Sequence, residues 1–185
     1  NTAIAVITSA FNYLFRETYQ QSMIAKIIGE TIKTPCPGIF IKWVELTATY
    51  LKLDVAVKPF FSGGWPLEEN VNEYHWDQFV SLVKQANNFL VMSMENHYSP
   101  ILGYAVYRYS ADSNDDGVNK WIILGECYPW VKSSWIRSLH FSLAPPIWMV
   151  RFEFIRRAFA RNKQNGIICI SRNISENKNS SCSLL

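Results

Sequence analysis

The stretch from residue 98 to residue 126 constrains the fold of this chain more than any other part of the sequence. Residues 98–109 are rich in Tyr, Val and Ile, which favour β-strands, and residues 121–126 have the same character. Between them lie the turn-forming residues 112–117, with the sequence Asp-Ser-Asn-Asp-Asp-Gly. Two strands joined by a polar loop form an antiparallel hairpin, which is stable only within a larger sheet or against a helix. The sequence therefore predicts an antiparallel sheet in the middle of the chain.

Apolar patterns elsewhere predict helices that would pack on this sheet. Residues 3–15 are apolar nearly all round, as in a helix buried in a core. Residues 40–51 repeat apolar side chains at helical spacing, and residues 74–86 also have a helical pattern. Helices followed by an antiparallel sheet indicate an α+β fold. The remaining predicted elements are strands at residues 54–61, 89–94 and 167–171, and a last helix over residues 148–162 that Pro145-Pro146 would introduce.

The length of 185 residues suits one compact domain with a substantial core. We expect this domain to span residues 1–172, followed by a polar tail at residues 173–185 whose composition is typical of disorder. Aromatic residues make up 15% of the chain, a high share that indicates bulky core packing or a large contact surface. The formal net charge of +3 is too small to predict nucleic-acid binding.

The four cysteines form no recognisable site. Cys36, Cys127, Cys169 and Cys182 contain no CxxC pair and no Cys/His spacing typical of zinc. The acidic residues of 112–117 lack the ligand pattern of a calcium loop, so we expect neither a metal nor a cofactor. Because no disulfide framework is recognisable, we expect a reducing intracellular compartment, and a start without Met is also compatible with an organelle such as the mitochondrion. No apolar run approaches the ~20 residues of a membrane span, so we expect none.

Residues 96–104 carry the most informative motif of the chain. Their sequence, Asn-His-Tyr-Ser-Pro-Ile-Leu-Gly-Tyr, resembles the segment G-H-F-S-P-I-G-G-Y of the phytochelatin synthases. The chain is thus similar to the catalytic domain of this glutathione γ-glutamylcysteinyltransferase family over residues 1–172. The resemblance implies a papain-like fold, in which an N-terminal helix packs on an antiparallel sheet. Further segments resemble the family in the same order: residues 11–14, residues 38–40 with the helix after them, and residues 77–84, 121–136 and 165–172.

The resemblance also implies three site positions. Enzymes of this family use a Cys at the start of the first helix, which attacks glutathione, expels glycine and passes the γ-glutamylcysteine unit to a second glutathione. His97 stands at the position of the family's catalytic base, Thr2 at that of the nucleophilic Cys, and Gly125 at that of the Asp. A Thr hydroxyl holds its proton far more tightly than a thiol, and Gly125 has no carboxylate to orient the imidazole. The family's chemistry would therefore lack both its nucleophile and its acid.

Neighbouring residues are poor substitutes for these two groups. Side chains alternate along a strand, so Glu126 should face away from the side of Gly125. Cys127 would return to that side, but on the wrong wall of the cleft for attack, and Cys36 lies in a loop. An isolated His on a strand is most often a hydrogen-bonded structural residue, and this interpretation stays open for His97.

Two classes of function are compatible with these observations. The first, which we favour, is a catalytically inactive phytochelatin-synthase-like domain that acts as a structural or interaction subunit of a larger assembly. The second is an active γ-glutamylcysteine dipeptidyl transferase or thiol peptidase with a displaced nucleophile; binding of glutathione or a metal thiolate without turnover lies between them. We expect contact with other protein chains from Trp130 to Arg161, where aromatic and basic residues alternate. The alternative is that these rings pack inward while the arginines solvate the outer face.

Overall fold

The computed structural model describes residues 2–31, 40–62, 73–94, 97–108, 118–125, 140–144, 147–152 and 166–173. Helices α1 (Thr2–Phe15), α2 (Gln21–Thr31) and α3 (Phe40–Tyr50) come first, followed by strand β1 (Val55–Ser62) and helix α4 (Glu73–Lys84). The other described elements are the strands β2 (Asn88–Met94), β3 (His97–Arg108), β4 (Val118–Gly125), β5 (His140–Ala144), β6 (Ile147–Arg151) and β7 (Gly166–Arg172). The predicted α+β class is confirmed.

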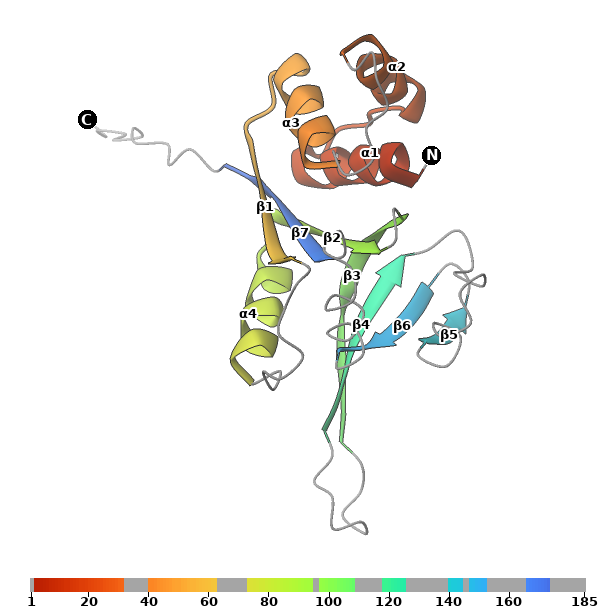
Figure 1. Cartoon of the computed structure of the whole chain (residues 1–185), viewed down its shortest axis with the longest axis vertical. Coiled ribbons are helices and arrows are strands. Elements are labelled where there is room, and N and C mark those ends of the chain that lie inside the picture. Colours follow the sequence, from red (N-terminus) through yellow and green to blue (C-terminus); the bar gives the residue numbers. More distant parts are fainter. Residues whose placement is uncertain are drawn as a thin grey trace, which may run out of the picture.

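The described strands form one sheet in the order β1-β7-β2-β3-β4-β6-β5, and every neighbouring pair is antiparallel. Helices α1, α2 and α3 gather at one end of the molecule, and α4 lies apart from them (Figure 1). Because side chains alternate between the two faces of a strand, β2 and β7 can serve helices on both sides. The sheet therefore lies between helices α1, α2 and α3 on one face and helix α4 on the other.

Each face of the sheet has its own core. The three-helix core lies between α1, α2, α3 and the sheet, and the α4 core lies between α4 and the sheet. Phe89 and Val91 of β2 contribute to the three-helix core, whereas Leu90 and Met92 contribute to the α4 core. The residues of β7 divide in the same way, with Ile168 and Ile170 in the three-helix core and Ile167 and Cys169 in the α4 core.

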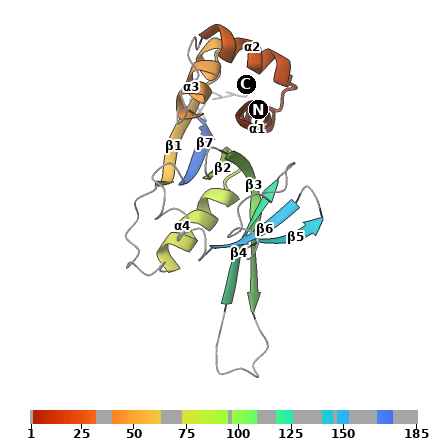
Figure 2. The same cartoon turned by 45° about the vertical axis from the view of Figure 1, so that its right-hand side comes forward.

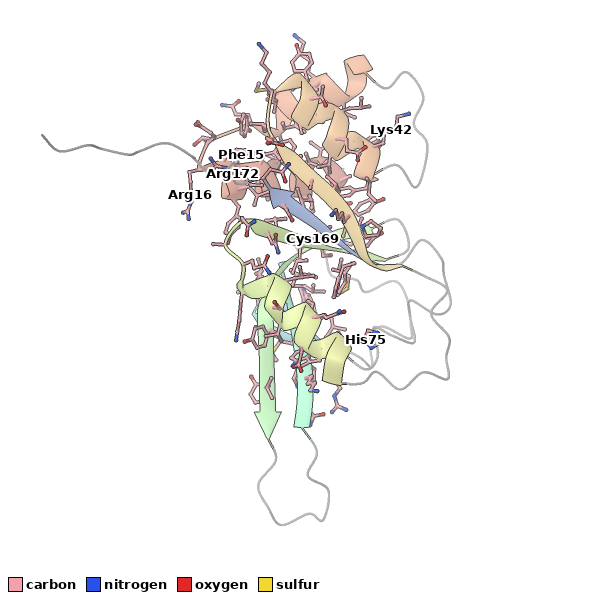
Figure 3. The ribbon with its side chains drawn as sticks, turned by 90° about the vertical axis from the view of Figure 1, so that its left-hand side faces the viewer. Phe15, Arg16, Lys42, His75, Cys169 and Arg172 are labelled. Carbon is pink, nitrogen blue, oxygen red and sulfur yellow. The ribbon has the colours of Figure 1, made fainter. Side chains whose placement is uncertain are left out.

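Helix α1 is held firmly in the three-helix core, as its apolar sequence predicts. Its Ile7 and Phe11 have no exposed surface. The side chain of Asn12 closes the following loop, because its Oδ1 accepts from the Tyr19 N–H at 2.6 Å and its Nδ2 donates to the Tyr19 carbonyl at 3.1 Å. The guanidinium of Arg172 donates to a carbonyl in the last turn of α1 and lies over the ring of Phe15 (Figure 3). These contacts attach α1 to the end of β7.

Aromatic rings fill the α4 core. Trp76 and Phe79 of α4 are buried, and their ring centroids lie 5.5 Å apart. Phe152, directly after β6, contacts Trp76 edge-on at 5.0 Å, and Tyr104 of β3 does so at 5.7 Å. Some of the many aromatic residues of the chain therefore pack inside the domain.

The predicted elements agree with the described structure except at residues 147–151, in the C-terminal part of the chain. The helix predicted over residues 148–162 is wrong at its start, since Ile147–Arg151 is the strand β6. Strand β6 pairs with β4 and buries Met149 and Val150, and this pairing outweighs the local helical signal from Pro145-Pro146. Helix α2 and strand β5 were not predicted. The rest of that helix, the loop 112–117 and the tail after Asn173 lie outside the described residues.

The strands β3 and β4 extend beyond α4 and beyond their neighbouring strands (Figures 1 and 2). Their antiparallel pairing continues to Arg108 and Val118, which confirms the predicted hairpin. Two side chains near this end are largely exposed: Val106 at 44% and Tyr107 at 53%. Because neighbouring residues of a strand point to opposite faces, apolar surface is exposed on both sides of the projecting ribbon.

Candidate functional site

Thr2, at the predicted nucleophile position, is the first residue of α1 and is partly buried. Helix α1 packs against β2, β3 and β7 from the side of the three-helix core. The predicted arrangement of an N-terminal helix on an antiparallel sheet is therefore confirmed. The hydroxyl of Thr2 stands where the resemblance requires a thiol.

His97 is the first residue of β3 and points away from α1. Ser99 lies opposite Met92 of β2, and both Met92 and Ile101 belong to the α4 core. Since residues 97, 99 and 101 alternate in step along the strand, His97 faces the same side. The imidazole therefore lies on the α4 side of the sheet, whereas α1 covers the opposite side.

A β-bulge at Leu102 sets this orientation. The pairing of β3 with β4 is regular beyond Leu102, but there the register shifts by one residue, so that Ile101 lies opposite Leu124. Without the bulge, Ile101 would lie opposite Gly125, and side chains at positions 97 and 125 would share a face. With the bulge, Ile101 and Leu124 both enter the α4 core. Because His97 alternates in step with Ile101 along β3, its side chain also faces the α4 side.

Gly125, at the predicted acid position, ends β4 and lies opposite Ile147 of β6. A Cβ atom at this position would lie 3.3 Å from Cγ of Pro100 and 3.3 Å from both Cδ atoms of Leu102. Pro100 has the opposite alternation to His97 along β3, so an acid at position 125 would stand on the other face of the sheet. The structure places positions 97 and 125 on neighbouring strands but does not bring their side chains together.

Tyr98, rather than His97, faces the first helices. Its ring stacks on that of Phe40, at the start of α3, with centroids 4.4 Å apart and an angle of 20° between the planes. Burial raises the pKa of the Tyr98 hydroxyl, and a hydrogen bond with Ser93 partly opposes the increase. Sequence reasoning missed this residue because it followed the family motif; the signal is the alternation of His97 and Tyr98 along the strand.

Cys169 is a buried thiol between β7 and α4 (Figure 3). Its side chain is 6% exposed, and its Sγ lies 3.3 Å from Oγ of Ser171, which donates in turn to Oδ1 of Asn88 at 2.8 Å. Burial raises the pKa of the Cys169 thiol, while the hydrogen bond with Ser171 and the charge of Lys58 partly lower it. A neutral, buried thiol is a poor nucleophile. The candidates Cys36, Glu126 and Cys127 lie outside the described residues, as does Cys182.

The described part of the chain offers no evident metal centre. No group of three or more His, Cys, Asp or Glu side chains among these residues is placed to hold an ion. In the same part of the chain, no helix combines the length and the apolar character needed to cross a membrane.

The predicted contact region, Trp130 to Arg161, is described only for β5, β6 and Phe152. Phe152 is buried in the α4 core, and Trp148 packs against the same core. Arg151 lies over the ring of Trp121, with its Cζ 5.2 Å from the ring centroid. In this portion the rings of Trp148 and Phe152 therefore pack inward, which is the alternative considered for this segment.

Three exposed apolar side chains, Leu102, Tyr107 and Ile147, lie on the face of β3, β4 and β6 opposite α4, where Trp121 and Arg151 are partly buried and Met149 is buried. We call this surface the outer face and define it by Leu102, Tyr107, Trp121, Ile147 and Arg151. Leu102 is 56% exposed and Ile147 37% exposed, and the pairing of the strands assigns all five residues to the same face. Exposed aliphatic and aromatic side chains with an Arg beside them are typical of contact surfaces.

Comparisons of the chain with models of known protein families, with curated proteins and with solved structures find no match. The resemblance to phytochelatin synthase rests on the sequence motifs and stays a prediction.

Proposed function

We propose that this chain is a degenerate, papain-like domain of the phytochelatin synthase type that does not catalyse γ-glutamylcysteine transfer and instead serves as an interaction subunit of a larger protein assembly. The observation that carries the proposal is the bulge at Leu102, which turns His97 to the face opposite position 125. The position of α1 against β3, with β4 as the next strand, supports the papain-like assignment.

Thiol transferases of this kind need three groups on one side of a cleft. The base must reach the nucleophile, and the acid must hold the base in the correct tautomer and orientation. Here the nucleophile position holds a hydroxyl, the acid position holds Gly125, and His97 shares a face with neither Gly125 nor the helix that begins at Thr2. A substitution could return a thiol or a carboxylate to either position, whereas bringing side chains at positions 97 and 125 to a common face requires a different strand register.

An interaction role is supported by the outer face. Leu102 and Tyr107 each expose more than half of their surface. Burial of such large side chains against a partner would be favourable, because it removes apolar surface from water. Arg151 and Trp121 form a cation–π pair on the same face, and Trp, Tyr and Arg are the residues on which binding energy is most often concentrated. We propose that other protein chains of the assembly contact this face.

The test is the native state of the protein in its source. The full chain, purified under mild conditions, should elute as part of a complex with other protein chains, and native mass spectrometry should give a stoichiometric partner. A monodisperse monomer without a co-purifying partner would overturn the interaction role.

Two neighbouring substitutions distinguish the outer face from the rest of the projecting ribbon. Tyr107→Asp places a charge on the outer face, whereas Val106→Asp places the same charge on the opposite face of the same strand. Each substitution replaces a residue that favours β-strands with Asp, which does not, so Val106→Asp is a matched control for the effect of Tyr107→Asp on folding. Tyr107→Asp should weaken capture of the partner by about tenfold or more, equivalent to ~1.4 kcal/mol, and Val106→Asp should leave it unchanged. Equal capture by both variants would contradict the assignment of the face.

A further inference from the structure

We draw no further inference here: the strongest candidate, the apolar surface of the projecting β3–β4 ribbon on the side of Val106, carries nothing, because no residue that the structure describes shows what would cover it.

Discussion

At the scale of single residues, position 125 limits what introducing the side chains implied by the resemblance to phytochelatin synthase can achieve. The double substitution Thr2→Cys with Gly125→Asp should not produce phytochelatin synthesis, because the new carboxylate would lie beside Pro100 and Leu102, on the face opposite His97. The unsubstituted chain should also be inactive, because Thr2 provides no thiol and Gly125 no carboxylate. The measurement is chromatographic detection of γ-glutamylcysteine oligomers after incubation with glutathione, with and without cadmium.

The matched control for this experiment is Thr2→Cys with Gly125→Ala, which adds the Cβ atom without the carboxylate. Circular dichroism of both variants verifies that the sheet is retained. Product that requires the Asp as well as the Cys, and that disappears with His97→Ala, would show that the side chains meet and would restore the active-enzyme hypothesis.

The buried thiol of Cys169 should make stability depend on pH in the alkaline range. Its pKa is raised in the folded state by burial, so above the ordinary Cys pKa of about 8.5 the unfolded chain loses a proton that the folded chain retains. The unfolded state then binds fewer protons, and the free energy of unfolding falls as pH rises from that value towards the folded-state pKa. Urea unfolding between pH 7 and pH 9.5 measures the slope.

Cys169→Ala is the control for this pH dependence. The variant loses part of the α4 core and should be less stable at every pH, but its curve should fall less steeply between pH 8 and pH 9.5. Identical slopes for both proteins would mean that the thiol ionises as readily in the folded chain as in the unfolded chain.

At the scale of one element, the end of α3 has an unfavourable residue at a position that prefers glycine. The Leu53 N–H donates to the Ala48 carbonyl at 2.8 Å and the Lys52 N–H to the Thr49 carbonyl at 3.1 Å, which is the Schellman pattern. Lys52 accordingly has a φ of 56°, in the left-handed region. Lys52→Gly should therefore raise the free energy of unfolding by about 0.5–1 kcal/mol, measured by denaturant titration.

Lys52→Ala serves as the comparison, because it removes the ammonium but keeps the Cβ atom that makes the left-handed conformation costly. It should change stability by less than about 0.5 kcal/mol. A gain that is equal for Ala and Gly would attribute the effect to the charge rather than to the backbone conformation.

At the scale of the whole molecule, the two cores share β2 and β7 and should unfold together. Ile7 lies in the three-helix core and Ile122 in the α4 core, both without exposed surface. Ile7→Val and Ile122→Val should each lower the stability by about 0.5–1.5 kcal/mol. Each should shift the same single transition, since opening either core exposes one face of the shared strands.

The measurement is thermal unfolding followed by both near- and far-ultraviolet circular dichroism. Two transitions, of which each substitution shifts only one, would show that the cores are separate folding units and that the chain is not the single domain that its length suggests.

Local sequence patterns are sufficient for the elements whose apolar side chains follow a single period. Helix α1 is apolar nearly all round and is buried accordingly, and the strands β3 and β4 are recognisable by their Tyr, Val and Ile content on either side of a polar turn. The α+β class and the antiparallel hairpin follow from these elements. The absence of a thiol at Thr2 and of a carboxylate at Gly125 can also be read from the sequence, but the importance of these two positions is a prediction that rests on the resemblance of residues 96–104.

Tertiary pairing decided the rest. Residues 147–151 form a strand because they pair with β4. The local sequence of these residues carries no information about that pairing. The face of His97 depended on a one-residue bulge at Leu102, which places both Ile101 and Leu124 in the α4 core. Side chains alternate with a period of two, so a shift of one residue exchanges every side chain between the two faces of a strand. The sequence by itself determined which residues could take part in a site; the register between the consecutive strands β3 and β4 determined which of them face one another.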